Sequence, residues 1–278
     1  MKNKSIIIIL IIVLSILTLS LTAFMFFILI KGTNINFIFN RKSEIIYEES
    51  YNIEDIEELK ITTISSDINF KSSTDGKVKV IVYGDEYNDL KVNLDNSTLN
   101  IDYDLKNSFC LGFCYQNDRV IVYIPENFDK KLNITTTSGD TLGINLINAN
   151  LDLVTVSGDV QINSINETNI TTTSGEILIN KVSDLKIKTI SGDIEIDSIT
   201  NKLNIETISG DIEINNLTLT NNSKIKTTSG DVEIDRTENV YIDTTTTSGD
   251  VKVKDNDRKA EYDLTIKTTS GDIEVNDY

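Results

Sequence analysis

The second half of the chain alternates apolar and polar residues in short segments that break at a recurring Ser-Gly pair. Residues 188–196 read KTISGDIEI, and near-copies follow at 206–214 (ETISGDIEI) and 226–234 (KTTSGDVEI). The Ser-Gly pair occurs eight times between Ser138 and Gly271, at intervals of 17 to 22 residues. A constant phrase at variable spacing predicts one structural unit whose loops tolerate insertions.

Aligned on the serine, the copies share apolar columns on both sides of the Ser-Gly pair. The position two before the serine is always threonine, and the positions four before and three after are Ile, Leu or Val except at Thr244 and Thr141. Because alternate residues of a strand point to opposite faces, each copy predicts two short strands with apolar residues inward and polar residues outward. The inward positions lie an even number of residues before the serine and an odd number after it. This change in the alternation predicts a bend at Ser-Gly. A further apolar position near Ile165, Ile199 and Leu217 predicts a brief third side.

Two strands in every copy, stacked copy on copy, predict an all-β fold: a parallel, β-helix-like solenoid of eight SGD coils over residues 132–278. The crossover rule for parallel strands favours a right-handed coil. The last copy ends the chain, so we expect its open edge to be blunted by the charge of Asp277 beside Tyr278, or covered by another chain.

Residues 44–131 are expected to form an N-terminal β cap over the other end of the stack. Within them, residues 59–70 (LKITTISSDINF) fit the repeat with Ser66 in the place of glycine, which predicts a degenerate first coil. Further strands are predicted at Lys77–Tyr83, Leu90–Leu94, Thr98–Asp104 and Arg119–Ile124.

An uncharged, mostly apolar run extends from Ser5 to Ile30. A helix of this length crosses a bilayer, and no cleavage motif follows it. Residues 1–30 are therefore expected to be a short cytoplasmic tail and a transmembrane signal anchor, and residues 31–43 a linker. Short basic N-terminal tails favour an N-in orientation, which predicts a single-pass cell-membrane protein with an extracytoplasmic C-terminal domain.

Composition narrows the function. A formal net charge of −17 argues against nucleic acid as a partner, because phosphate recognition needs surplus Lys and Arg. The chain has no histidine, which excludes Ser-His-Asp triads and His-ligated metals. β-Helix enzymes that cut polysaccharides pair Asp with Arg or Lys in a cleft that long side loops build. In residues 132–278 the only arginines are Arg236 and Arg258, and no long loop is expected to build a cleft. We therefore predict no catalytic residues and no cofactor, and keep a polysaccharide-degrading enzyme as an alternative.

The Ser-Gly-Asp turns are the main candidate site residues. Glycine adopts backbone angles that other residues avoid, and Ser and Asp side chains can bond amides freed by a turn. This predicts a structural role at Ser138, Gly139, Asp140, Ser191, Gly192, Asp193, Ser209, Gly210, Asp211, Ser229, Gly230 and Asp231. Stacked carboxylates can also bridge a divalent cation, so a weak calcium site at Asp193, Asp211, Asp231 and Asp250 is the alternative, and no other metal site is predicted. The inward threonines are expected to bond the neighbouring rung.

Cys110 and Cys114 lie in the apolar segment SFCLGFCYQN, on an expected hairpin tip. Outside the cell such a pair is expected to close a small disulfide loop. The loop is expected to pack onto the cap, or else to contact a partner or the membrane surface.

The repeated TTSGD[IV]x[IV] phrase, the IVYIPENF strand before the first regular coil and the membrane anchor resemble the bacterial "putative adhesin" β-repeat family. That family is a domain of unknown function, and some members are encoded with envelope-stress systems. The resemblance implies a membrane-anchored β-solenoid that serves as a non-catalytic adhesin-like binding protein or cell-envelope scaffold. The alternative is an accessory protein of an envelope-stress response. A cell-wall polymer or a membrane protein is the expected partner, and the oligomeric state stays open.

Overall fold

The computed structural model describes residues 43–276 except 85–88, 105–117, 239 and 255–257. The described residues are all-β, with nineteen strands in one continuous sheet and one short 3-10 helix, η1 (Ile53–Asp55). The expected transmembrane segment, 5–30, lies outside the described residues. From residue 43 onward, no described helix is long and apolar enough to cross a membrane.

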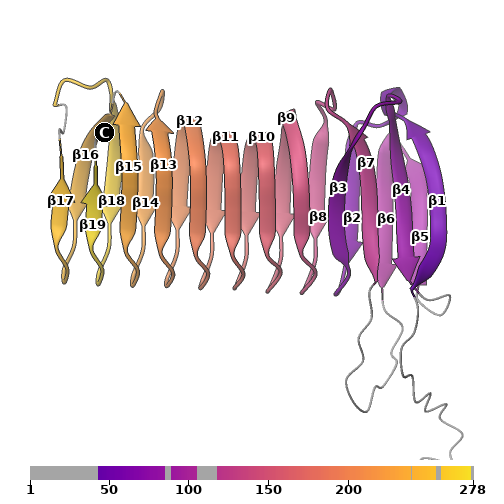
Figure 1. The fold of residues 1–278 in the computed structure, drawn as a ribbon, viewed down its shortest axis with the longest axis horizontal. Helices are drawn as coiled ribbons and strands as arrows, with labels where there is room; N and C mark the ends of the chain where they lie inside the picture. Colours follow the sequence, from indigo (N-terminus) through magenta and orange to yellow (C-terminus); the bar gives the residue numbers. More distant parts are fainter. Residues whose placement is uncertain (1–42, 85–88, 105–117, 239, 255–257, 277–278) are drawn as a thin grey trace, which may run out of the picture. The chain divides into compact units, whose positions relative to one another are not determined.

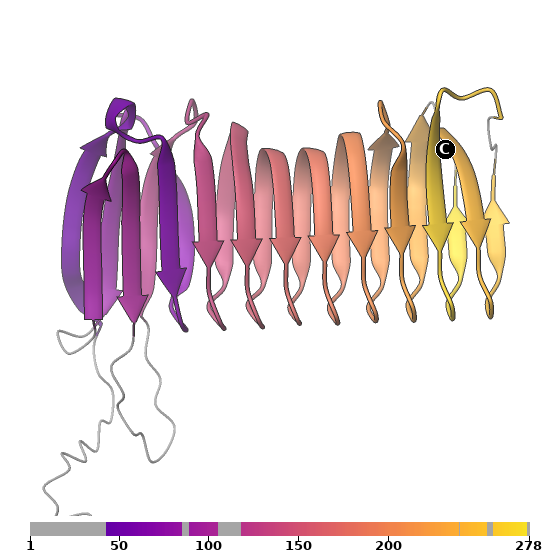
Figure 2. The same cartoon turned by 180° about the vertical axis from the view of Figure 1, so that it is seen from behind.

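Each rung of the sheet consists of a strand that enters a Ser-Gly-Asp turn and a strand that leaves it. β8 (Lys131–Thr135) enters the first turn and β9 (Thr141–Val154) leaves it, then continues through the opposite bend as the entering strand of the next rung. The same continuous path is taken by β10 (Val160–Thr171), β11 (Ile177–Lys188) and β12 (Ile194–Glu206). The tight turns therefore line one long edge and the smooth bends line the other (Figures 1 and 2).

The next rungs follow with β13 (Ile212–Thr218), β14 (Ser223–Lys226) and β15 (Val232–Glu238). All pairing within the repeats is parallel. The register is constant from β12 to β15 and shifts locally where β10 pairs with β9 and where β11 pairs with β12. We call the outward side of the strands that enter the turns face A, and the outward side of the strands that leave them face B.

The core lies between the two faces and consists of stacked aliphatic columns. Ile177, Ile194, Ile212 and Val232 are neighbours on four successive rungs, and each is 1% exposed. β-Branched side chains pack well in such columns. Ile199 is equally buried, but β12 runs unbroken past it, so a smooth bend takes the place of the separate third side that the pattern predicted.

Residues 58–73 form a rung of their own. β2 (Glu58–Thr63) and β3 (Asp67–Ser73) pair in parallel with β8 and β9 on one side. On their other side they pair in parallel with β6 (Thr98–Asp104) and β7 (Arg119–Pro125). A rung that comes later in the sequence thus lies outside an earlier one.

Antiparallel strands continue the sheet beyond β6 and β7. β5 (Asp89–Asp95) pairs with β6, β4 (Lys77–Gly84) pairs with β7, and β1 (Glu44–Asn52) pairs with β4. The bounds of β4 to β7 agree with the predicted strands to within one residue at each end, because strand alternation and turn residues are local signals.

At the other end, the last rung of the sequence is inserted between the two rungs before it. β18 (Tyr262–Lys267) and β19 (Ile273–Val275) pair on one side with β14 and β15. On the other side they pair with β16 (Val240–Thr245) and β17 (Val251–Val253). Figure 1 shows β17 at the outer end of the stack and β19 inside it.

The prediction that the last copy of the repeat forms the open edge is therefore wrong. Thr244, the exception in its apolar column, belongs to the outermost rung and is half-buried. The interval from Ser248 to Ser270 is the longest because the chain must pass from the outer rung back to the slot inside it. The hand of the coil stays a prediction.

Candidate functional site

The Ser-Gly-Asp turns stack so closely that their glycines have no room for a side chain. Gly210 has a φ of 121°, and a Cβ added there would lie 2.3 Å from the carbonyl oxygen of Gly192 on the adjacent rung. The amide of Ser209 donates a hydrogen bond to the carbonyl oxygen of Ile190, also on that rung, at 2.9 Å. The Ser-Gly pairs thus make contacts between backbones, from rung to rung.

In most turns, the carboxylate of the acid after the glycine accepts a hydrogen bond from a backbone amide of the next rung and not of its own turn. The Asp159 amide donates to Oδ1 of Asp140 at 2.9 Å, and the Asp211 amide donates to Oδ1 of Asp193 at 2.9 Å. In the spatial order of the rungs, the carboxylates of Asp211, Asp231 and Asp272 accept the same hydrogen bond from the amides of Asp231, Asp272 and Asp250, respectively. We call this row of carboxylates the aspartate ladder. Within the described residues, Glu176, whose side chain is one methylene longer, makes no such contact with the next rung.

Burial raises the pKa of Asp140, the hydrogen bond from the Asp159 amide lowers it, and the nearby charges of Asp67 and Asp159 raise it. The predominant effect is the cost of removing a carboxylate from water. The Asp140 carboxylate is therefore held as a hydrogen-bond acceptor at an electrostatic cost.

Most of the carboxylates of the predicted weak calcium site already take part in the aspartate ladder. One oxygen each of Asp193, Asp211 and Asp231 already accepts an amide hydrogen bond. Across the described ranges, no group of three or more His, Cys, Asp or Glu side chains is arranged to hold a metal ion. Capping of the next rung is the use of these carboxylates that the geometry shows.

The buried threonines mostly bond within their own turns. Oγ1 of Thr207 donates to the serine carbonyl two residues on, at 3.0 Å, and Oγ1 of Thr155 accepts from the Gly158 amide at 3.1 Å. The expectation that this column bonds the neighbouring rung is wrong for these residues, because the turn itself brings a closer partner. A hydroxyl contact between rungs joins Thr63 to Thr136 at 3.1 Å.

Face B carries a line of like charges. Glu195, Glu213, Glu233 and Glu274 are direct neighbours on four successive rungs. Burial raises the pKa of Glu213, and the charges of Glu195, Glu233 and Asp235 raise it further. Because adjacent strands are only about 4.8 Å apart, these carboxylates repel one another, and together they repel anions.

Replacing Glu213 with glutamine is expected to stabilise the fold at pH 7 and low salt by about 0.2–1 kcal/mol, the cost of like charges placed directly opposite one another. Since the folded-state pKa is raised, the charged form is what costs stability. The difference from the parent should therefore appear as pH rises above the unfolded-state pKa, and vanish in acid.

Urea unfolding at several pH values measures this effect. Glu206→Gln is the matched control with the opposite sign, because Glu206 lies 3.5 Å from the Lys188 ammonium and 3.9 Å from that of Lys224. A loss of stability in Glu213→Gln at pH 7 would contradict the proposed repulsion.

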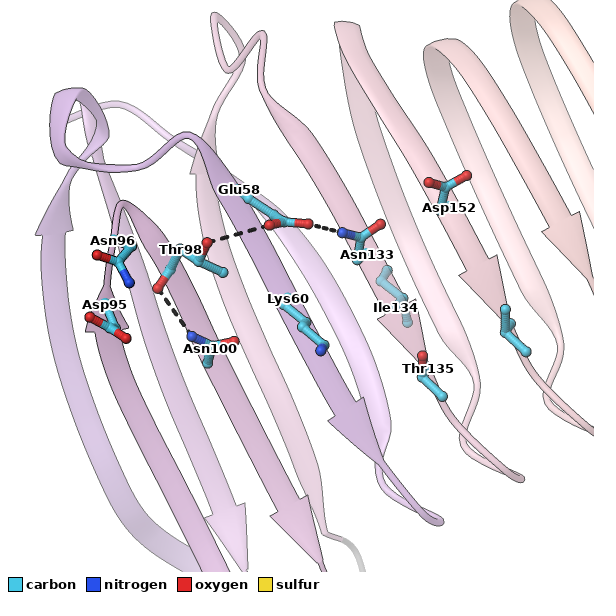
Figure 3. A pocket seen from close by; sticks show the side chains of 11 residues that line it. Glu58, Lys60, Asp95, Asn96, Thr98, Asn100, Asn133, Ile134, Thr135 and Asp152 are labelled. Atoms are coloured by element: carbon cyan, nitrogen blue, oxygen red, sulfur yellow. Dashed lines mark hydrogen bonds between the residues drawn. The ribbon is translucent and has the colours of Figure 1, made fainter.

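Face A carries an open polar depression of about 500 Å³ where the antiparallel strands meet the first rungs (Figure 3). Glu58 accepts a hydrogen bond from Thr98 at 3.3 Å on one side and another from Asn133 on the other, and so joins three rungs. Lys60 lies between Asn100 and Asn133 on the adjacent strands. Fixed groups that both donate and accept hydrogen bonds suit hydroxyl-rich or charged polar ligands.

Asp152, at the far side of the depression, forms an ion pair with a lysine next to the depression. Nζ of Lys131 lies 2.8 Å from Oδ2 of Asp152, and Asn169 donates to Oδ1 of Asp152 at 3.3 Å. The Lys131 ammonium holds the pKa of Asp152 below its usual value, and Asp152 raises the pKa of Lys131. Both groups therefore stay charged at neutral pH.

The sequence alone does not reveal this depression. Its residues come from separate parts of the chain, including Asp95 and Asn96 at the turn between β5 and β6. Only the outward parity of these positions was visible in the sequence. The other predicted contact site, the loop with Cys110 and Cys114, lies outside the described residues.

A family model described as Toastrack DUF4097 matches residues 56–276. Among solved structures, a "putative lipid binding protein" from Parabacteroides distasonis is 16% identical, with a TM-score of 0.53, and the match covers 84% of this chain and 98% of that one. A "putative cell adhesion protein" from Clostridium sporogenes is 12% identical, with a TM-score of 0.30, and the match covers 85% and 100%. A "putative adhesin" from Bacteroides fragilis is 12% identical, with a TM-score of 0.34, and the match covers 85% and 98%. No curated protein matches.

Proposed function

This chain belongs to the Toastrack DUF4097 family, in agreement with the predicted β-repeat family, and from this premise we propose that it is a membrane-anchored, extracytoplasmic, non-catalytic binding scaffold of the cell envelope. Residues 5–30 would anchor it, residues 31–43 would link the anchor to the fold, and residues 44–131 would cap the stack. The apolar run at the N-terminus supports the anchor.

The observation that carries the proposal is the display of outward side chains in register. Asn133, Asp152 and Asn169 are neighbours on three successive rungs of face A, and the last two are hydrogen-bonded. Such side chains are already ordered, so a ligand that repeats along the stack can bind them at a low entropic cost. A cell-wall polymer is a ligand of this kind.

Two measurements test the proposal. In intact cells, external protease should remove an epitope tag from the C-terminus of the full-length chain and leave an N-terminal tag untouched. The purified full-length protein should co-sediment with isolated cell walls. Protection of the C-terminal tag, or no co-sedimentation, would contradict the proposed location or the proposed binding.

The depression on face A is tested by a pair of double variants. Asn100→Ala with Asn133→Ala is expected to weaken co-sedimentation several-fold, because these amides border the depression. Asn163→Ala with Asn180→Ala removes two exposed amides from face B and should leave it unchanged. Equal losses in both pairs would show that the depression is not the binding site.

A further inference from the structure

A cluster of five lysines lies on face A in the C-terminal half of the stack. We propose that this lysine patch, Lys186, Lys188, Lys224, Lys226 and Lys267, binds a linear phosphate-bearing polyanion that runs along the stack. The inference rests on the proposed binding function and names the chemistry of its ligand.

The patch occupies two adjacent columns on four successive rungs. One column contains Lys188, Glu206, Lys226 and Lys267 as direct neighbours. The other contains Lys186, Asn204, Lys224 and Thr265, again as direct neighbours. With rungs about 4.8 Å apart and alternate residues about 7 Å apart along a strand, the ammonium groups form a short, narrow grid.

The insertion of the last rung brings Lys267 into the grid. Lys226 and Lys267 are direct neighbours in the structure. If the rungs followed the sequence, Thr245 would lie between them. The insertion therefore places two lysines side by side that the sequence separates by a neutral residue.

Most of the charge of the patch is available to a ligand. Glu206 is the one carboxylate within the two columns, and it pairs with Lys188 and Lys224, whose side chains are still 53% and 45% exposed. Among the described residues, Lys226 and Lys267 form no ion pair, and both are exposed. A positive surface in a chain of net charge −17 attracts anions only locally.

Acidic residues border the patch and select the shape of the ligand. On face A, Asp152 lies two rungs before Lys186, and Asp243 lies one rung beyond Thr265. The aspartate ladder runs along the nearby turns. A broad anionic membrane would bring these carboxylates within a Debye length of about 8 Å, whereas a single polymer strand lies over the lysines alone.

The test uses the full-length protein in detergent and linear inorganic polyphosphate as the probe, with affinity followed by fluorescence anisotropy. The parent should bind, and binding should weaken as salt is raised. Replacing Lys188, Lys226 and Lys267 together with glutamine should weaken binding by about tenfold or more, because three of the five ammonium groups that would contact the phosphates are removed.

The matched control replaces Lys71, Lys79 and Lys252 with glutamine, which removes the same total charge from other strands. It should change the affinity by no more than about threefold, because these lysines do not touch the proposed ligand. Equal losses in the two triple variants would overturn the proposal in favour of general charge attraction. No binding of polyphosphate by the parent would overturn it outright.

Two further arms separate the alternatives. Vesicles of phosphatidylcholine with phosphatidylglycerol test a lipid surface. If the parent binds these vesicles as tightly as it binds polyphosphate, and the Lys188, Lys226 and Lys267 variant loses both to the same extent, the choice of a polymer is overturned. If that variant keeps both its full affinity for polyphosphate and its co-sedimentation with cell walls, this inference fails while the proposed function stands. If the parent binds polyphosphate through the patch but does not co-sediment with cell walls, the proposed wall binding fails while the polyanion site stands.

Discussion

Replacing Gly210 with alanine is expected to lower the free energy of unfolding by about 3–5 kcal/mol, the range of severe single substitutions. Its φ of 121° is unfavourable for any residue with a side chain. The added Cβ would also lie 2.3 Å from a backbone oxygen of the adjacent rung, which cannot move without separating the two rungs. Thermal unfolding of the full chain, followed by circular dichroism, measures the loss.

Gly76→Ala is the matched control. Gly76 also has a positive φ, 70°, but nothing lies within 4 Å of an added Cβ. Only backbone strain of about 1–2 kcal/mol is expected there. If both variants lost the same stability, the close stacking of the turns would not be the reason for the glycine column.

Replacing Ile266 with alanine is expected to cost about 2–4 kcal/mol, since it leaves a cavity in the core. Ile266 is fully buried between Ile225 on one side and Thr244 on the other. Thr244→Ala, on the outermost rung, should cost about 1 kcal/mol or less, because its site is half-buried and its strand pairs on one side only within the part of the chain that the structure describes.

This pair of variants tests the order of the rungs, with urea unfolding as the measurement. A stack in sequence order would place residues 240–253 inside and the last copy at the edge. Ile266→Ala would then cost less stability than the same substitution at an inner residue such as Ile225. A cost for Ile266→Ala well below that of Ile225→Ala would argue against the inserted rung.

The insertion also determines which strands form the free edge. β16 and β17 pair on one side only within the described residues, and Lys252 and Lys254 lie on β17 or next to it. Charged side chains on an edge strand discourage the addition of further strands. The Lys252 ammonium lies 3.4 Å from the Glu274 carboxylate on the inserted rung. The edge rung and the inserted rung are therefore joined by an ion pair as well as by the pairing of β17 with β19.

The sequence by itself determined the strands and the Ser-Gly bends, which depend on neighbours along the chain. The alternation of Ile and polar residues predicted two strands in each copy, the change of parity predicted the bend at Ser-Gly, and residues 59–70 were recognisable as a further copy. These features are local, because strand alternation and turn chemistry act over a few residues. The parallel all-β stack follows from them, since the inward columns can be buried only by neighbouring copies.

Only the tertiary structure decided which copy lies beside which. All copies present nearly the same pattern of inward residues and turn, so pairing in either order buries nearly the same columns. Thr244 in place of Ile is a single difference, and the pattern alone does not rank the orders. The position of the last rung, the depression around Glu58, the ladder from Asp231 through Asp272 to Asp250, and the proximity of Lys226 to Lys267 all depend on that choice. They are contacts between rungs, and their energies arise only once the rungs are stacked.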